Sequence, residues 1–191
     1  MENALPIMQR YTTLEMGQLQ RLISEPGMID RGKQHINKLL NQHVLCRHQN
    51  KVQIGRSYQD ALYCGDHIIQ SVWVMLDMTK GIGIGCEILH GLDVYPFDTH
   101  FIVGDAMEYR LKVITNTTPS LILRMTDRRA DTGKVCYVLI AENPILLKNI
   151  EVPTDVPSVY AIYRRPNPWH APTIDYFTDK ECTKKWDLPN N

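Results

Sequence analysis

The stretch GDHIIQSVWVMLDMTKG, residues 65–81, decides the fold that we expect from this sequence. Asp66 can cap a helix, because its carboxylate accepts hydrogen bonds from the unpaired backbone N–H groups of a first turn. The residues that follow are apolar on nearly every side of a helix, and Lys80-Gly81 gives a helix-stop signal. Their β-branched side chains also allow a strand, but the length favours a helix. We therefore expect a helix over about 66–80 that is buried on most sides.

Four strands are expected after this helix. They span Ile82 to Tyr95, Ala106 to Thr115, Ser120 to Thr126 and Lys134 to Ala141. Asp131-Thr132-Gly133 is typical of a hairpin turn between the last two strands, and Asn116 to Pro119 is typical of another turn. Short consecutive connections favour an antiparallel sheet.

The chain before residue 55 is expected to be mainly helical, then to form two short strands. One helix should end at Glu25-Pro26-Gly27, and a second should run from Met28 to Leu40. His43 to Ile54 alternates around the polar His48-Gln49-Asn50, which predicts a strand, a turn and a strand. Beyond residue 150 prolines are frequent, and only Ser158 to Arg164 is expected as a strand. The remainder should be an extended tail that packs on the domain or is partly disordered.

The fold class that fits these elements is α+β of the hot-dog type, with an antiparallel sheet wrapped around the helix at 66–80. A helix that is apolar on every side needs cover on every side, and a curved sheet supplies it. The domain should span 1–150, and 151–191 should form the proline-rich strand and tail. A helix-grip or cystatin-like fold, with the helix lying across an open sheet, is the alternative.

Composition narrows the class of protein. The 191 residues suit one domain, and 21 basic against 21 acidic residues give no excess of cations for a nucleic-acid surface. The five cysteines are an odd number without a C-x-x-C pair, which argues against structural zinc and against a disulfide scaffold. No signal peptide or apolar run long enough to cross a membrane is recognised. We therefore expect a cytoplasmic protein with reduced thiols.

One segment resembles a known family. Val52-Gln53-Ile54-Gly55-Arg56-Ser57, followed by Gly65-Asp66-His67 at the start of an apolar helix, resembles the FcoT-like thioesterases, which have the hot-dog fold. Leu22 to Pro26 is similar to the end of that family's N-terminal helix, and residues 81 to 145 resemble the second half of hot-dog enzymes in general. The resemblance implies a homodimeric enzyme that acts on an acyl-CoA or acyl-carrier-protein thioester without a cofactor.

The family's catalytic pattern of two tyrosines and an asparagine is only partly present. The position of the asparagine falls on His67, that of the nearer tyrosine on Gln59 beside Tyr58, and that of the other tyrosine near Gly27. These departures from the family's pattern count against simple thioester hydrolysis. Relatives of the FcoT-like family in natural-product pathways are similar to enzymes that form β-amino acyl thioesters from α,β-unsaturated ones. Thioester hydrolysis and addition or elimination at the β-carbon both stay open.

The residues themselves suggest roles near the helix start. An imidazole gives or takes a proton near neutral pH, so His67 is the candidate general acid or base. Tyr58 and Tyr63 could donate a proton to a carbonyl, and the backbone N–H groups of Gly65 and Asp66 could stabilise an oxyanion. His67 is equally compatible with a structural role in the first helical turn. A Gly-Asp pair is common before ordinary helices, and tyrosines in this place more often pack at the helix entrance.

Two residues one turn further along the helix complete the candidate site. Gln70 could orient His67 or hold a substrate amide or carboxylate, and Ser71 lies beside it. Asp77 must be paired, protonated or near a helix end, because it lies within an apolar helix. Cys64 precedes the helix and is a weak candidate nucleophile.

Further charged groups are candidates for ligand binding. The pairs Arg128-Arg129 and Arg164-Arg165 could bind the phosphates of coenzyme A, although a solvated turn or strand end is the better explanation for each pair alone. Glu87, His90 and His100 are potential metal ligands, but Glu87 and His90 would point to opposite faces of a strand. No metal is therefore expected. Two further functions stay open: a non-catalytic binding protein for a hydrophobic small molecule, and a helix-grip cyclase or isomerase.

Overall fold

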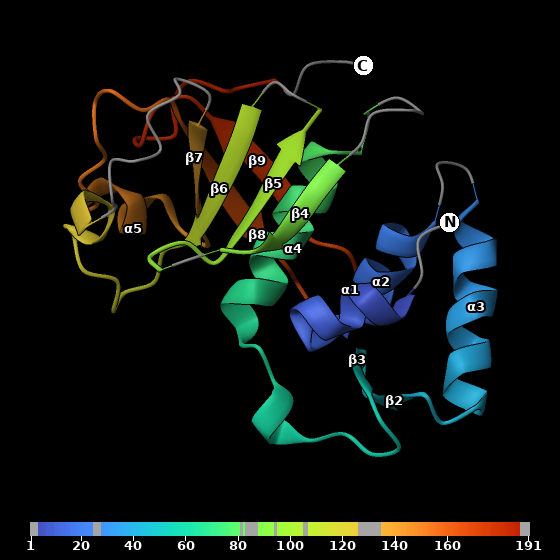
Figure 1. The fold of residues 1–191 in the computed structure, drawn as a ribbon. Coiled ribbons are helices and arrows are strands. Elements are labelled where there is room, and N and C mark those ends of the chain that lie inside the picture. The colour runs from blue at the N-terminus through green and yellow to red at the C-terminus, as the bar shows by residue number, and fades with distance from the viewer. Residues whose placement is uncertain are drawn as a thin grey trace. The chain divides into compact units, whose positions relative to one another are not determined.

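The computed structural model describes residues 4–24, 28–80, 82, 88–93, 95–104, 107–125 and 135–187. It is a mixed α+β structure, and the chain divides into two compact units (Figure 1). Unit 1 comprises Met1–Ile69 and Asn167–Ala171, and unit 2 comprises Gln70–Pro166 and Pro172–Asn191.

Unit 1 combines helices with a small antiparallel sheet of order β1-β3-β2. Its elements are α1 (Ala4–Tyr11), β1 (Thr13–Glu15), α2 (Met16–Ile23), α3 (Ile29–Asn41), β2 (Leu45–His48), β3 (Lys51–Ile54) and the 3-10 turn η1 (Asp60–Leu62). The expected helix at 28–40 and the expected strand pair before residue 55 are confirmed. Strand β1 was not expected, and it pairs with β3 through Leu14 and Val52.

Helix α4 (Asp66–Met78) confirms the helix expected from the opening stretch. Its residues from Ile68 to Leu76 are buried except Gln70, whereas Asp66 and His67 are exposed. In unit 1 the first turn of α4 is tied to α2, because Gln18 Nε2 donates a 2.7 Å hydrogen bond to the carbonyl of Ile69.

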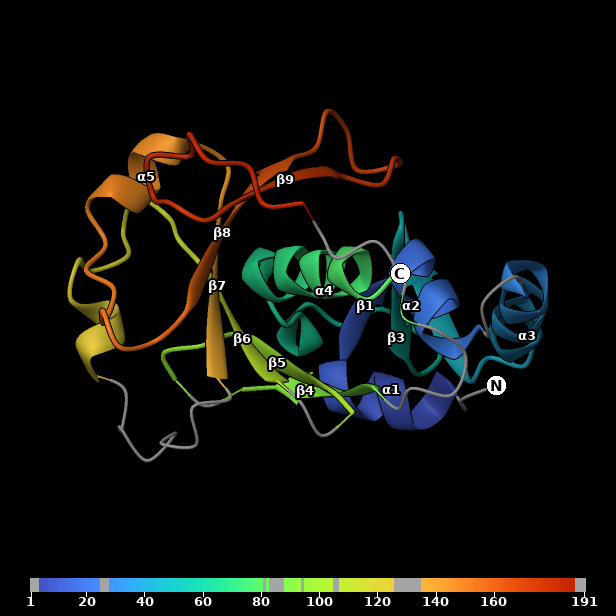
Figure 2. The ribbon, with the colours of Figure 1, turned by 90° about the horizontal axis from the view of Figure 1, so that it is seen from above.

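Unit 2 contains a six-stranded sheet in which spatial order follows chain order. The strands are β4 (Ile88–Leu92), β5 (Thr99–Val103), β6 (Met107–Val113), β7 (Val135–Ala141), β8 (Ser158–Arg164) and β9 (Thr173–Phe177). Figure 2 shows the sheet curving from β9 round to β4, with α4 on its concave side.

The expectation of a purely antiparallel sheet is wrong. β6 pairs with β7 and β7 with β8 in parallel, while the other neighbours are antiparallel. Residues 114–134 and 142–157 are long connections that contain η2 (Ile122–Met125) and α5 (Pro144–Lys148), and connections of this length can cross over to a parallel neighbour. The α+β class therefore holds, and the hot-dog arrangement remains a prediction.

The strand expected at Ser120 to Thr126 is also wrong, because this segment contains η2. The backbone N–H of Ile122 donates to the carbonyl of Pro119 at 3.1 Å, and Ile122 and Leu123 are both buried. This backbone hydrogen bond closes a tight turn and does not pair with a neighbouring strand. The hairpin turn expected at residues 131–133 lies outside the described residues.

The remaining strands were anticipated unevenly. β4 falls within the strand expected at 82–95, of which residues 83–87 and 94 lie outside the described residues. The strand at Ser158 to Arg164 is confirmed as β8. Strands β5 and β9 and helix α5 were missed. The expected tail contributes β9, which pairs antiparallel with β8.

The buried residues of α4 pack on one face of the sheet. A second apolar core lies on the opposite face, where η2 and α5 pack (Figure 2). Tyr137 and Leu139 of β7 contribute to it together with Leu147 of α5. Every residue of β7 is buried, as is typical of a parallel strand covered on both faces. Because both faces of β7 are covered, its carboxyl end is held in place next to that of β6. The candidate site lies at these two strand ends.

Candidate functional site

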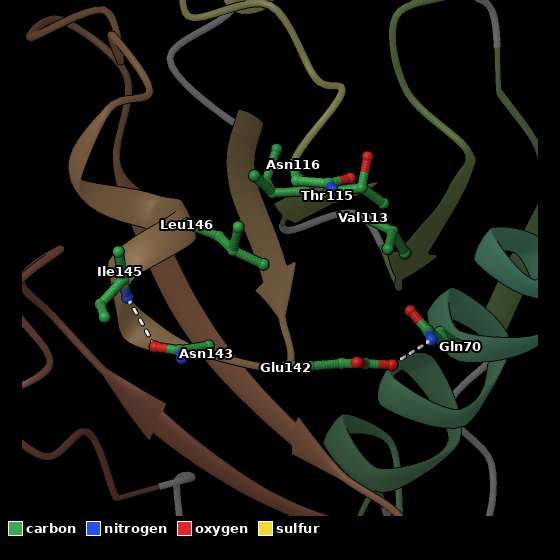
Figure 3. A pocket seen from close by; sticks show the side chains of 9 residues that line it. Gln70, Val113, Thr115, Asn116, Glu142, Asn143, Ile145 and Leu146 are labelled. Atoms are coloured by element: carbon green, nitrogen blue, oxygen red, sulfur yellow. Dashed lines mark hydrogen bonds between the residues drawn. The ribbon is translucent and has the colours of Figure 1, made fainter.

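A cavity of about 500 Å³ lies in unit 2 beyond the carboxyl ends of β6 and β7 (Figure 3). Its lining residues are Gln70, Val113, Ile114, Thr115, Asn116, Glu142, Asn143, Ile145 and Leu146. Because β6 and β7 are parallel, their carboxyl ends meet at the same edge of the sheet. Crevices at this edge are the usual ligand sites of sheets with parallel strands. We call this cavity the Gln70–Glu142 pocket.

The polar end of the pocket is formed by the two side chains that name it. Gln70 Nε2 of α4 donates a 3.1 Å hydrogen bond to Glu142 Oε1, which follows β7, and Figure 3 shows the two side chains pointing toward one another. A carboxylate only accepts hydrogen bonds, so the amide of Gln70 must turn its NH2 group toward Glu142. The second oxygen of Glu142 has no part in this bond.

The apolar part of the pocket comes from the two connections that follow the strands. Val113 ends β6 and Ile114 follows it. The N–H of Ile114 donates to the carbonyl of Ile140 at 2.7 Å, which fixes this wall. Ile145 and Leu146 belong to α5, and the side chain of Ile145 is 62% exposed. An apolar wall with a few polar groups at one end is typical of small-molecule sites.

The polar residues between these walls hold the loops in place. Asn143 caps α5, because its Oδ1 accepts a 2.9 Å hydrogen bond from the N–H of Ile145. Thr118 Oγ1 accepts a 2.9 Å hydrogen bond from the N–H of Thr115. Gln70, Glu142 and Asn116 take no part in these two contacts, and all three line the pocket.

The predicted catalytic residues at the start of α4 belong to unit 1. The Tyr63 hydroxyl donates to the Asp66 carboxylate, and Lys51 Nζ lies 3.8 Å from Asp66 Oδ1 and 3.9 Å from the centroid of the Tyr63 ring. Burial, followed by this hydrogen bond, raises the pKa of Tyr63 above its ordinary value. Tyr63 therefore keeps its proton at physiological pH and cannot serve as a base.

Gly65 and His67 lie directly against one another. Gly65 has a φ of +94°, and a Cβ atom there would lie 2.5 Å from His67 Cε1. Only glycine suits both this backbone conformation and this close approach. The exposed imidazole of His67 therefore lies beside the backbone that was expected to bind a carbonyl.

Tyr58 packs on a neighbouring strand. Its ring centroid lies 5.0 Å from that of His48 in β2, and burial together with the charge of Asp60 raises its pKa. The loop that contains Tyr58 is held by Gln53, whose Oε1 accepts a 2.8 Å hydrogen bond from the N–H of Gln59. Gly27, the place of the family's other tyrosine, lies outside the described residues.

The predicted substrate-binding residues have different environments. Gln70 lines the pocket, whereas Ser71 is fully buried. Glu142 and the segments 113–116 and 142–146 were missed. The sequence signal for Glu142 is a carboxylate directly after a buried strand. This signal predicts a ligand site only if β6 and β7 are known to be parallel, because the ends of parallel strands meet at one edge of the sheet.

Cys64 is poorly suited to nucleophilic chemistry. Its Sγ donates to the carbonyl of Thr13 at 3.2 Å, and burial raises the pKa of the thiol to about 11. The fraction of thiolate at neutral pH is therefore small.

The other charged candidates have structural partners. Asp77 accepts a 3.1 Å hydrogen bond from the Tyr176 hydroxyl of β9 and lies 3.8 Å from Lys80 Nζ, so this carboxylate is paired as expected. Arg164 forms an ion pair with Asp175. The Arg165 guanidinium lies 5.8 Å from the centroid of the Trp73 ring.

The remaining candidates do not form a metal centre among the described residues. His90 lies on β4 and His100 on β5, while Glu87 and the pair Arg128-Arg129 lie outside the described residues. Within the described ranges no group of three His, Cys, Asp or Glu side chains could hold a metal ion. In the same part of the chain no helix has the length and apolar character needed to span a bilayer.

Comparisons with protein-family models, with curated proteins and with solved structures find no match for this chain.

Proposed function

We propose that the protein binds a small molecule in the Gln70–Glu142 pocket. The observation that carries this proposal is the cavity of about 500 Å³ at the carboxyl ends of two parallel strands. Its apolar wall suits an alkyl or aromatic body, and the Gln70–Glu142 pair suits a polar head group. Neither feature requires a reaction, so the proposal is a binding function.

The test is a titration of the full ¹⁵N-labelled chain with six-carbon probes that carry different head groups. Binding should shift the amide signals of residues 113–116 and 142–146. Ile145→Ser should lower the affinity for every probe by about threefold to tenfold, because each apolar CH2 group that is no longer buried costs roughly 0.8 kcal/mol of binding free energy.

Leu121→Ser is the matched control. Leu121 is an exposed apolar side chain of unit 2 that does not line the pocket, so its replacement should leave probe binding unchanged. Equal weakening by both variants, or shifts confined to residues outside the pocket, would contradict the proposal.

A second candidate function is an enzyme acting on an acyl-CoA or acyl-carrier-protein thioester at the start of α4. The observation that favours it is the exposed imidazole of His67 against Gly65, next to the backbone N–H groups of a helix start. His67 would act as general acid or base in hydrolysis or in addition and elimination at the β-carbon.

Assays of saturated and α,β-unsaturated thioesters test this candidate. His67→Ala should lower turnover by about 100-fold or more if the imidazole transfers a proton. His170→Ala is a suitable control, because His170 is an exposed histidine of the same unit and has no proposed chemical role. Turnover that is absent in the wild-type protein, or unchanged in His67→Ala, removes His67 from any such mechanism.

A further inference from the structure

Among the residues that the structure describes, the Gln70–Glu142 pocket is lined by one charged side chain, Glu142, and by no lysine, arginine or histidine. We propose that this pocket selects a small molecule carrying a protonated amine on an apolar body, with the Glu142 carboxylate binding the ammonium group. This inference rests on the binding function proposed above and adds the chemical class of the ligand.

The hydrogen-bonding pattern of the pair favours a donor over an acceptor. Glu142 Oε1 accepts from Gln70 Nε2, which turns the amide oxygen of Gln70 away from the carboxylate. The pair therefore offers two acceptors, Glu142 Oε2 and Gln70 Oε1, on neighbouring side chains. An ammonium group carries three donors and no acceptor, so it suits a polar end that offers acceptors.

An anionic ligand would be repelled by the charge of this pocket. A carboxylate or phosphate in this pocket would approach Glu142, and no cation among the described lining residues offsets the repulsion. A neutral alcohol could donate one hydrogen bond to Glu142, but it would lack the charge-assisted contribution that an ammonium group gains. The expected order of affinity is therefore amine, then alcohol, then carboxylate.

The body of the ligand is defined by the apolar wall. Ile114 is 2% exposed and rigidly placed, whereas Ile145 at 62% exposure marks the open side of the pocket. An alkyl or aromatic group lying between them would cover Ile145 and remove apolar surface from water. Because Glu142 is itself exposed, its attraction for a cation is screened by water and salt.

The experiment titrates the full ¹⁵N-labelled chain with hexan-1-amine, hexan-1-ol and hexanoate at pH 7 and low salt. The amine should bind about fivefold to tenfold more tightly than the alcohol, as expected for a partly screened charge-assisted hydrogen bond, and 0.5 M salt should reduce this difference. Hexanoate should bind most weakly.

Glu142→Gln should bring the affinity for hexan-1-amine down to that for hexan-1-ol. Glu181→Gln, the same chemical change at an exposed site outside the pocket, should preserve the preference for the amine. Comparison of the two variants separates a contact in the pocket from a general effect of net charge.

Three outcomes would overturn the inference. Equal binding of amine and alcohol, with both weakened by Ile145→Ser, rejects the amine preference and leaves the proposed binding function standing. An amine preference that survives Glu142→Gln assigns the cation to another residue and rejects the role of Glu142. No binding of any probe rejects both proposals.

Discussion

At the scale of single residues, two features of the structure have opposite effects on the pKa of the Cys64 thiol. Cys64 lies two residues before α4, and a helix N-terminus commonly lowers the pKa of a nearby thiol. Burial acts in the other direction and dominates, raising the pKa to about 11. The side chain is therefore a neutral hydrogen-bond donor to Thr13 rather than a thiolate.

The first prediction concerns the alkylation of this thiol. With a pKa of about 11, the thiolate fraction at pH 8 is on the order of one in a thousand, and it rises about tenfold per pH unit up to that pKa. Cys64 in the native protein should therefore react slowly with iodoacetamide at pH 8 and faster at each higher pH. The measurement is the alkylation rate of the Cys64 peptide by mass spectrometry.

The denatured chain provides the control for the alkylation measurement. Without burial the thiol should return toward its ordinary pKa near 8.5, so Cys64 should react much faster at pH 8 after denaturation. Rapid alkylation in the native protein at pH 7, equal to that of the denatured chain, would show that burial does not control this thiol.

At the scale of elements, the β5–β6 hairpin depends on one buried ion pair. Asp98, just before β5, accepts a 2.6 Å hydrogen bond from the N–H of Val113 and lies 2.9 Å from Lys112 Nζ on β6. The two side chains are 5% and 15% exposed. The pair closes the start of β5 onto the end of β6, beside the wall of the Gln70–Glu142 pocket.

The second prediction is that Asp98→Ala lowers the free energy of unfolding by about 3–5 kcal/mol, because it leaves the Lys112 charge buried without a partner. The double variant Asp98→Ala/Lys112→Met should recover part of this loss, since it removes the unpaired charge. Denaturant unfolding followed by circular dichroism measures both values.

The exposed ion pair between Arg164 and Asp175 is the matched control for this hairpin. It joins two strands of the same sheet, but its side chains are 55% and 38% exposed. Asp175→Ala should cost at most about 1 kcal/mol, as is typical of surface ion pairs. If the two aspartate variants lose equal stability, burial is not what makes the Asp98 pair important.

Elements with a strong local pattern were predictable from the sequence. Helix α4 and strand β8 were placed almost to the residue, because burial of each imposes a continuous apolar pattern on its own sequence. Helix α5 was missed because it has only five residues, and its Asn143-Pro144 start follows β7 after one residue. Strand β9 was missed because prolines are frequent around it, although none lies within it.

The candidate site was harder to predict than the elements. Gln70 was recognised as a ligand-binding candidate from its place on α4, but its partner Glu142 is 72 residues away in the sequence. The contact between them depends on how α4 packs against the end of β7, which no local pattern indicates. Tyr63, Gly65, Asp66 and His67 lie together because they are neighbours in sequence at the start of one helix, and their catalytic role stays a prediction.

At the scale of the whole molecule, pairing of distant strands determines the topology of unit 2. The parallel pairs β6–β7 and β7–β8 bring together segments separated by long connections, and these connections contribute η2 and α5 to the second core. Antiparallel neighbours such as β4 and β5 need only short turns. The same crossover connections create both the second core and the pocket, so the site is a consequence of the mixed sheet.

The formal net charge of the whole chain is zero at pH 7, which leads to the last prediction. A molecule without net charge has little electrostatic repulsion against its own copies, so solubility should be lowest near neutral pH. Histidine side chains in general gain positive charge as the pH falls, and the sequence contains seven, so solubility should rise between pH 7 and pH 5.5. Precipitation by polyethylene glycol measures this change, with circular dichroism confirming that the protein stays folded.

A charge variant separates net charge from other effects of pH. Lys33 and Lys38 are exposed on α3, and reversing both to glutamate changes the formal charge by two at each position, from 0 to −4 at pH 7. This variant should be more soluble than the wild-type protein at pH 7 and should lose that advantage near pH 5.5, where the histidine charges offset the added glutamates. If its solubility at pH 7 equals that of the wild-type protein, attraction between specific surfaces, rather than the absence of net charge, limits the solubility of this molecule.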